Sequence, residues 1–219
     1  VDGYIITPTK GLEKDIVALQ ETGKPLILID RYFPNVPSNY VVLNNYQGAY
    51  DAAAHLVKQG YRRIGIVTTT SGQVQMRDRF NGFEAALKAL QVPLQKQHIK
   101  RLAFDMQRPV FIAEMKKFFQ SVPGLDAVFF ATNYLGIYGI EAIRSLGLQI
   151  GKDIGMISFD DHDIFRLNTP SISCVAQPIE EMGNRIVKVL MDEMAAPTEE
   201  RHQVVLAPTL LIRESSPER

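Results

Sequence analysis

Uninterrupted apolar runs alternate with helix-period segments along most of this chain. Leu26–Ile29, Ile64–Thr68 and Ile154–Phe159 are runs of this kind. They do not alternate apolar with polar residues, so we expect strands buried on both faces, as in a parallel sheet covered by helices. Strand and helix patterns in alternation predict an α/β protein with doubly wound parallel sheets and right-handed crossovers.

The same patterns predict individual elements. The expected strands are Tyr4–Thr7, Leu26–Asp30, Ile64–Thr68, Ile99–Phe104, Asp126–Ala131, Ile154–Phe159, Gln203–Leu206 and Thr209–Ile212. The expected helices are Lys10–Glu21, Gln47–Gln59 with Asn45 as its N-cap, Arg77–Leu90, Pro109–Gln120, Tyr134–Leu146 and Ile179–Met194. The pattern changes near Cys174–Pro178, where we expect a boundary in the architecture.

Composition excludes several classes of protein. The chain has 219 residues and a formal net charge of zero, without the basic stripe of a protein that binds bare phosphate backbones. Its one cysteine, Cys174, excludes an internal disulfide framework. Its apolar runs are far shorter than the roughly 20 residues that span a bilayer, so we expect no membrane partner.

Polar residues close three of the apolar runs. Asp30 follows Leu26–Ile29, Asn133 follows the run that ends near Thr132, and Asp160 follows Phe159. In an open parallel sheet, ligands bind beyond the carboxyl ends of the strands. Short side chains that accept and donate hydrogen bonds at one edge favour a polyol or sugar site.

Other chemistries fit these residues less well. The acidic run Asp160–Asp163 has the oxygen ligands of a Mg²⁺ or Ca²⁺ site, but neighbouring strand residues point to opposite faces. Asp30, Asp105 and Asp160 are candidates for a general acid and base, but no feature of the sequence separates their pKa values. Gly147–Asp153 lacks the spacing of a phosphate loop. We therefore expect no metal, no cofactor and no catalytic residue.

Nine motifs occur together in a fixed order. They are Val1–Pro8, Pro25–Arg31, Asn44–Ala49, His55–Gly65, Arg79–Phe83, Phe129–Asn133, Ser158–Asp161, Gln177–Pro178 and Ile212–Ser215. This ordered set resembles the effector-binding domain of the LacI/GalR family of bacterial transcription regulators, over nearly the whole chain. The resemblance implies a type I periplasmic-binding-protein-like fold: two doubly wound parallel-sheet lobes joined by three crossovers.

The resemblance also implies a domain organisation. The first lobe would hold residues 1–43 and 178–206, and the second lobe residues 44–177 and 207–219. In family terms the chain begins at the third strand, so the first lobe would be incomplete. The helix-turn-helix DNA-binding head would be absent from this chain.

The effector contacts of the family transfer to matching positions. Asp30 matches the acid that ends its strand, Arg79 the arginine of the R-x-x-G-[FYW] motif, and Asp160 the first acid of the G-[FY]-D-D motif. Asn133 matches the asparagine of an Asn-Asp pair, and Gln177 the glutamine of a crossover. Phe104 or Asp105 falls where the family places an aromatic ring. Tyr134 replaces the acid of the Asn-Asp pair and adds a ring or hydroxyl there, and Asn44 replaces the usual Asp of its crossover.

By resemblance we expect the effector-sensing domain of a cytoplasmic bacterial repressor. It would bind a sugar or sugar derivative between its lobes, form a homodimer, and reach operator DNA through the N-terminal head. The helix near Pro109–Gln120 and the segment Ile164–Asn168 would contribute to the dimer. Two alternatives stay open: a periplasmic sugar-binding transport receptor of the same fold, and a carbohydrate hydrolase that uses Asp30 and Asp160.

Overall fold

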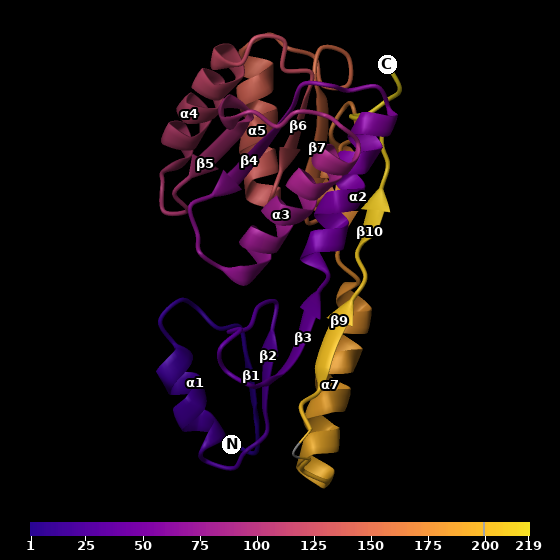
Figure 1. Ribbon diagram of the computed structural model, residues 1–219. Coiled ribbons are helices and arrows are strands. Elements are labelled where there is room, and N and C mark those ends of the chain that lie inside the picture. The colour runs from indigo at the N-terminus through magenta and orange to yellow at the C-terminus, as the bar shows by residue number, and fades with distance from the viewer. Residues whose placement is uncertain (199) are drawn as a thin grey trace. The chain divides into compact units, whose positions relative to one another are not determined.

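The computed structural model describes residues 1–198 and 200–219, and the chain divides into two compact units (Figure 1). Unit 1 contains Val1–Asn44, Gly72–Gln75 and Pro178–Ala207. Unit 2 contains Asn45–Ser71, Met76–Gln177 and Pro208–Arg219. Each unit is built on its own β-sheet.

Unit 1 has a four-stranded parallel sheet. Its strand order is β1 (Tyr4–Ile6), β2 (Leu26–Ile29), β3 (Asn39–Leu43) and β9 (Gln203–Leu206). Helix α1 (Glu13–Gln20) covers one face, where Ile16 packs with Leu26 and Leu28. Helix α7 (Ile179–Ala195) covers the other face, where Met182 and Val189 pack with Ile27. The alternation of Ile27 and Leu28 between these clusters explains why β2 is apolar throughout.

Unit 2 has a six-stranded sheet. Its strand order is β10 (Thr209–Leu211), β8 (Ser173–Ala176), β7 (Gly155–Phe159), β6 (Ala127–Phe130), β4 (Ile64–Thr69) and β5 (Ile99–Leu102). All neighbouring strands are parallel except β10, which runs antiparallel to β8. The carboxyl ends of β4 to β8 therefore share one edge of this sheet.

Helices cover both faces of the sheet in unit 2. They are α2 (Asn45–Lys58), α3 (Val74–Ala89), α4 (Arg108–Ser121), α5 (Asn133–Ser145) and the short α6 (Asp163–Leu167), with a 3₁₀ turn at Lys96–His98. Phe129 stacks on Phe83 of α3, with ring centroids 5.5 Å apart. The next residue, Phe130, packs with buried residues of α4 and α5, and its ring leaves no room for a Cβ at Gly139. Neighbouring residues of β6 thus pack against helices on opposite faces of the sheet.

The C-terminal segment is fastened to unit 2 by a buried polar cluster. Ser215 Oγ donates to the carbonyl of Met156 at 2.6 Å, and the Oγ atoms of Ser173 and Ser216 are 2.7 Å apart. His55 Nε2 of α2 lies 3.1 Å from Ser216 Oγ. Burial lowers the pKa of His55, so the imidazole is neutral near pH 7 and can share a hydrogen bond with this hydroxyl.

Three sequence expectations need correction. The strands β3 and β8 were not among the expected strands. Asn45 is not an N-cap, because α2 already begins at Asn45. β10 runs antiparallel to β8, whereas we expected parallel sheets. As a separate finding, none of the helices in residues 1–198 and 200–219 is long and apolar enough to cross a membrane.

Candidate functional site

Asp160 lies at the carboxyl edge of the sheet in unit 2, directly after β7. Its backbone φ is 65°, in the left-handed region that non-glycine residues seldom occupy. Such a conformation costs about 1–3 kcal/mol and persists where the surroundings hold it, often at ligand sites. The carboxylate of Asp160 is 20% exposed, so it is accessible but largely enclosed.

The partner of Asp160 is Arg79 of α3. Nη1 of Arg79 lies 2.9 Å from Oδ2 of Asp160, and Nη2 lies 3.2 Å from Oδ1, in a two-point ion pair. Nη1 also donates to the carbonyl of Ala131 at 2.7 Å, and Nε donates to Oδ1 of Asn45 at 2.8 Å. Arg79 is 3% exposed, so these contacts replace nearly all of its hydration.

An aromatic ring fixes the plane of this guanidinium. Cζ of Arg79 lies 3.7 Å from the ring centroid of Phe159, the last residue of β7. This cation–π contact adds attraction and blocks rotation of the side chain. The helix can come this close because Gly82, one turn further along α3, has no Cβ to strike Tyr46 of α2.

The side chain of Gln177 is the last member of the cluster. Gln177, directly after β8, donates from Nε2 to Oδ1 of Asp160. We use the name Asp160 cluster for Asp160, Arg79, Gln177, Asn45 and Phe159. Its one positive and one negative charge cancel, and its members are placed by two strands, β7 and β8, and two helices, α2 and α3, all within unit 2 at these positions. Such a cluster can exchange hydrogen bonds with hydroxyl groups without adding net charge.

Asp30 occupies a comparable position in unit 1. It directly follows β2 and has a φ of 66°, nearly the same as Asp160. Its Oδ2 accepts from Nε of Arg31 at 2.9 Å and from Nε2 of Gln75 at 3.4 Å. Gln75 is 5% exposed, and its buried Oε1 has no hydrogen-bond partner within the described part of the chain. Asp30 is therefore held in place by two side chains of its own unit.

The remaining predicted contacts are less closely associated. Asn133 is half-buried as the first residue of α5. Tyr134 packs edge-on against Phe111, with ring centroids 6.0 Å apart, within the α4–α5 layer. Phe104 and Asp105 both lie exposed in the turn after β5, and Phe104 is 74% exposed. Among the described residues, the side chains of these four take no part in the hydrogen bonds, the ion pair and the ring contact that join the members of the Asp160 cluster to one another.

The acidic run after β7 separates into different ion pairs. Asp160 binds Arg79, Asp161 forms a two-point pair with Arg213, and Asp163 lies 3.3 Å from Arg166. The hydrogen bond from Arg213 lowers the pKa of Asp161, and burial raises the pKa of the nearby Cys174 thiol to about 12. Oδ1 of Asp161 also accepts from the backbone N–H of His162 at 2.9 Å, and Nδ1 of His162 accepts from the backbone N–H of Ile164 in α6. The described residues contain no group of three potential metal ligands.

Sequence reasoning missed three members of these networks. Asn45 was interpreted as a helix cap and Phe159 as the end of a buried strand, and Gln75 was not singled out. The available signal was position, because Asn45 lies two residues after the undetected strand Asn39–Leu43, whereas Asp160 lies directly after β7. Nothing in the sequence pairs Arg79 with Asn45.

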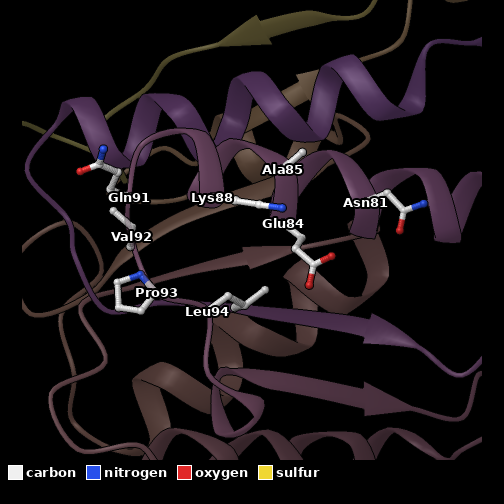
Figure 2. A pocket seen from close by; sticks show the side chains of 8 residues that line it. All are labelled: Asn81, Glu84, Ala85, Lys88, Gln91, Val92, Pro93 and Leu94. Carbon is white, nitrogen blue, oxygen red and sulfur yellow. The ribbon is translucent and has the colours of Figure 1, made fainter.

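Unit 2 also has an open hollow on its surface, shown in Figure 2. It has a volume of about 880 Å³ and is lined by Asn81, Glu84, Ala85, Lys88, Gln91, Val92, Pro93 and Leu94. These residues come from the outer side of α3 and the loop that follows it. The lining contains no aromatic ring and no member of the Asp160 cluster, so it lacks the features expected of a sugar site.

Comparison with known proteins agrees with the fold. The family model described as the periplasmic binding protein-like domain matches residues 53–216. The ribose operon repressor of Haemophilus influenzae is 29% identical over 191 residues, which are 87% of this chain and 57% of that protein. The HTH-type transcriptional regulator CelR of Thermobifida fusca is 28% identical over 217 residues, 98% of this chain and 63% of that protein. The chain thus spans about three fifths of the length of these relatives.

Solved structures give the same result. A complex of the transcriptional regulator CelR with cellobiose superposes with a TM-score of 0.87 at 26% identity, covering 98% of this chain and 66% of that one. A regulatory protein of the LacI family from Chloroflexus aggregans has a TM-score of 0.87 at 25% identity, covering 99% of this chain and 77% of that one. These relatives are transcription regulators rather than enzymes.

Proposed function

We propose, from the premise that this chain belongs to the periplasmic binding protein-like domains of LacI-family regulators, that it is the effector-sensing part of a transcriptional repressor. The effector is a small, uncharged, hydroxyl-rich molecule, and we infer that it is a sugar. The Asp160 cluster of unit 2 is its principal anchor. The relatives named for ribose and cellobiose support this class of effector.

The observation that carries the proposal is the enclosed Arg79–Asp160 pair. An ionised carboxylate accepts hydrogen bonds from hydroxyl groups, and a guanidinium donates to ring and hydroxyl oxygens. Both groups are held at the edge where parallel sheets bind ligands. The left-handed backbone of Asp160 is a cost that a binding role explains.

Charge argues for an unphosphorylated effector. The positive charge of Arg79 is already paired with Asp160, and that of Arg31 with Asp30. A phosphate group near Asp160 would be repelled by its carboxylate, and the arginines that bind Asp160 and Asp30 in the described residues are already paired. Neutral hydroxyl groups carry no such penalty.

Other parts of the proposal rest on the family resemblance. By this resemblance, Asn133 and either Phe104 or Asp105 would be effector contacts of unit 2, and Asp30 would be an effector contact of unit 1. Effector binding would shift an equilibrium between two arrangements of the regulator and so change operator binding by a DNA-binding head outside these residues. The required free energy comes from unequal contacts of the effector in the two arrangements.

We also propose a homodimer that uses α4 and the segment around α6. In α6, Ile164 is 43% exposed and Leu167 is 71% exposed, and Val110 of α4 is 47% exposed. These exposed apolar side chains of α4 and α6 would gain from burial in such an interface. Sedimentation of the complete protein measures this directly. A concentration-independent monomer would contradict the dimer.

The alternatives have weaker support. A transport receptor shares the fold, but the relatives named above are regulators of transcription. A hydrolase would need two carboxylates with different proton affinities at one bond. Asp160 is instead committed to Arg79 and Gln177, which suits binding rather than proton transfer.

A thermal-shift screen of the complete protein tests the proposal. The panel contains neutral mono- and disaccharides, including ribose and cellobiose, together with their phosphate esters. We expect one neutral sugar to raise Tm by roughly 5–10 °C at a hundredfold excess over Kd. Its phosphate ester should have little effect. Stabilisation by phosphate esters alone, or by no sugar, would contradict the proposal.

A further inference from the structure

Two members of the Asp160 cluster lie where the chain passes between its units. The first passage falls between Asn44 and Asn45, and a later one between Gln177 and Pro178. Asn45 is therefore the first residue of unit 2, and Gln177 is the last residue before the chain returns to unit 1. Both residues bind the Arg79–Asp160 pair through their side chains.

Each passage contacts a different member of the ion pair: Asn45 binds Arg79, and Gln177 binds Asp160. Asn45 is 5% exposed, and its Oδ1 accepts the Nε–H of Arg79 at 2.8 Å. Gln177 donates to Oδ1 of Asp160, which also receives Nη2 of Arg79. The guanidinium is planar and rigid, so a rotation that changes its contact with Asp160 also changes its contact with Asn45.

We propose that Asn45 is a positioning residue for Arg79, and that Asn45 and Gln177 together couple the two passages through the Arg79–Asp160 pair. The consequence for regulation rests on the proposed function. An effector hydroxyl that donates to Oδ1 of Asp160 competes with Gln177, since this oxygen already accepts two hydrogen bonds and has about two lone pairs. Effector binding would then weaken the hold on the Gln177–Pro178 passage directly. It would weaken the hold on the Asn44–Asn45 passage through the movement of Arg79.

Hydrogen–deuterium exchange of the complete, ligand-free protein tests the coupling. In Asn45→Ala, the local amides of Asn45–Gln47 should exchange faster. The deciding readout is remote: the amides of Ala176 and Gln177 should also exchange about tenfold faster, because Arg79 loses the contact that fixes its Nε and holds Asp160 less firmly. A purely local role for Asn45 would leave Ala176 and Gln177 unchanged, and that result would overturn the proposal.

A reciprocal variant and a matched control complete the test. Gln177→Ala should accelerate exchange at Asn45–Gln47, because coupling acts equally in both directions. Gln177 is half-exposed, so this variant remains informative if Asn45→Ala does not fold. Asn39→Ala is the control. Asn39 is 3% exposed and its Oδ1 accepts one hydrogen bond from the His202 backbone, outside the cluster.

In Asn39→Ala neither passage should change its exchange by more than about twofold. Equal acceleration in Asn39→Ala and Asn45→Ala would attribute the effect to general loosening and overturn the proposal. Because the experiment uses no sugar, its failure leaves sugar binding intact. A failed sugar screen likewise leaves the exchange result standing.

Discussion

Arg79 and Asp160 form a two-point ion pair, with Nη1–Oδ2 and Nη2–Oδ1 distances of 2.9 and 3.2 Å. They come from α3 and from the end of β7, 81 residues apart in the sequence. The pair is enclosed rather than on the surface, because Arg79 is 3% exposed and stacks on Phe159. Because the pair is enclosed, we expect it to contribute to the folding stability of the protein as well as to effector binding.

Breaking this pair from the arginine side should destabilise the protein strongly. Arg79→Leu removes the cation that pairs with Asp160 and the Nε–H that donates to Oδ1 of Asn45. We expect a loss of about 2–4 kcal/mol in the free energy of unfolding by urea, slightly below that of a fully buried pair. Arg166→Leu is the matched control, because its pair with Asp163 is exposed and should contribute less than about 1 kcal/mol. Equal losses of unfolding free energy in the two variants would contradict the claim that enclosure makes the Arg79–Asp160 pair the more stabilising one.

The contact between α2 and α3 depends on Gly82. A Cβ at this position would lie 2.0 Å from the backbone oxygen of Tyr46. Gly82→Ala must therefore displace α3 and should destabilise the protein by at least about 2 kcal/mol. Gly183→Ala in α7 is the control, since among the described residues no heavy atom outside its chain neighbours and its own helix backbone lies within 4 Å of the added Cβ. Thermal unfolding of the two variants separates a steric effect from a helix-propensity effect.

Cys174 should be unreactive in the native state. It is fully buried, and burial raises the pKa of its thiol to about 12. The reactive thiolate is therefore scarce at pH 8. A thiol-specific disulfide reagent at pH 8 should label Cys174 only after denaturant is added. Rapid labelling of the folded protein would show that β8 opens readily.

Stability should fall on the acid side of neutrality. Burial lowers the pKa of His55 and of His98 below the ordinary value of 6.5. The unfolded chain then binds more protons than the folded chain below pH 6.5. The contribution of the neutral imidazoles is complete above pH 6.5 and is lost as the pH falls toward their lowered folded pKa values.

Urea unfolding at pH 7.5 and 5.5 measures this slope. His55→Gln should reduce it but leave the part due to His98. A slope that is the same in wild type and His55→Gln would contradict the assignment.

Much of the fold could be predicted because buried parallel strands have a distinctive sequence. Leu26–Ile29 and Gln203–Leu206 were predicted nearly to the residue. The strand β3 escaped because its apolar run is short and lies between two asparagines, while its stability comes from pairing with β2 and β9. The antiparallel direction of β10 leaves no trace in hydrophobic periodicity.

The candidate site was less predictable than the fold. Asp160 and Asp30 could be singled out because each follows a buried strand, and the structure places both in left-handed backbone. Asn45 could not, since asparagine also favours helix caps and only the fold brings Arg79 to its side chain. Resemblance supplied Arg79 and Gln177 as contacts, and only coordinates reveal that both bind Asp160.

Two adjacent carboxylates offer the most direct test of sugar binding at the Asp160 cluster. Asp160 belongs to the cluster, whereas Asp161 pairs with Arg213 outside it. Titration calorimetry would compare the most stabilising neutral sugar of the panel on wild type, Asp160→Asn and Asp161→Asn in the complete protein. We predict that Asp160→Asn weakens binding by about 2–4 kcal/mol and that Asp161→Asn changes it by less than about 0.5 kcal/mol. Unchanged affinity in Asp160→Asn, or an equal loss in both variants, would contradict the assignment of the site.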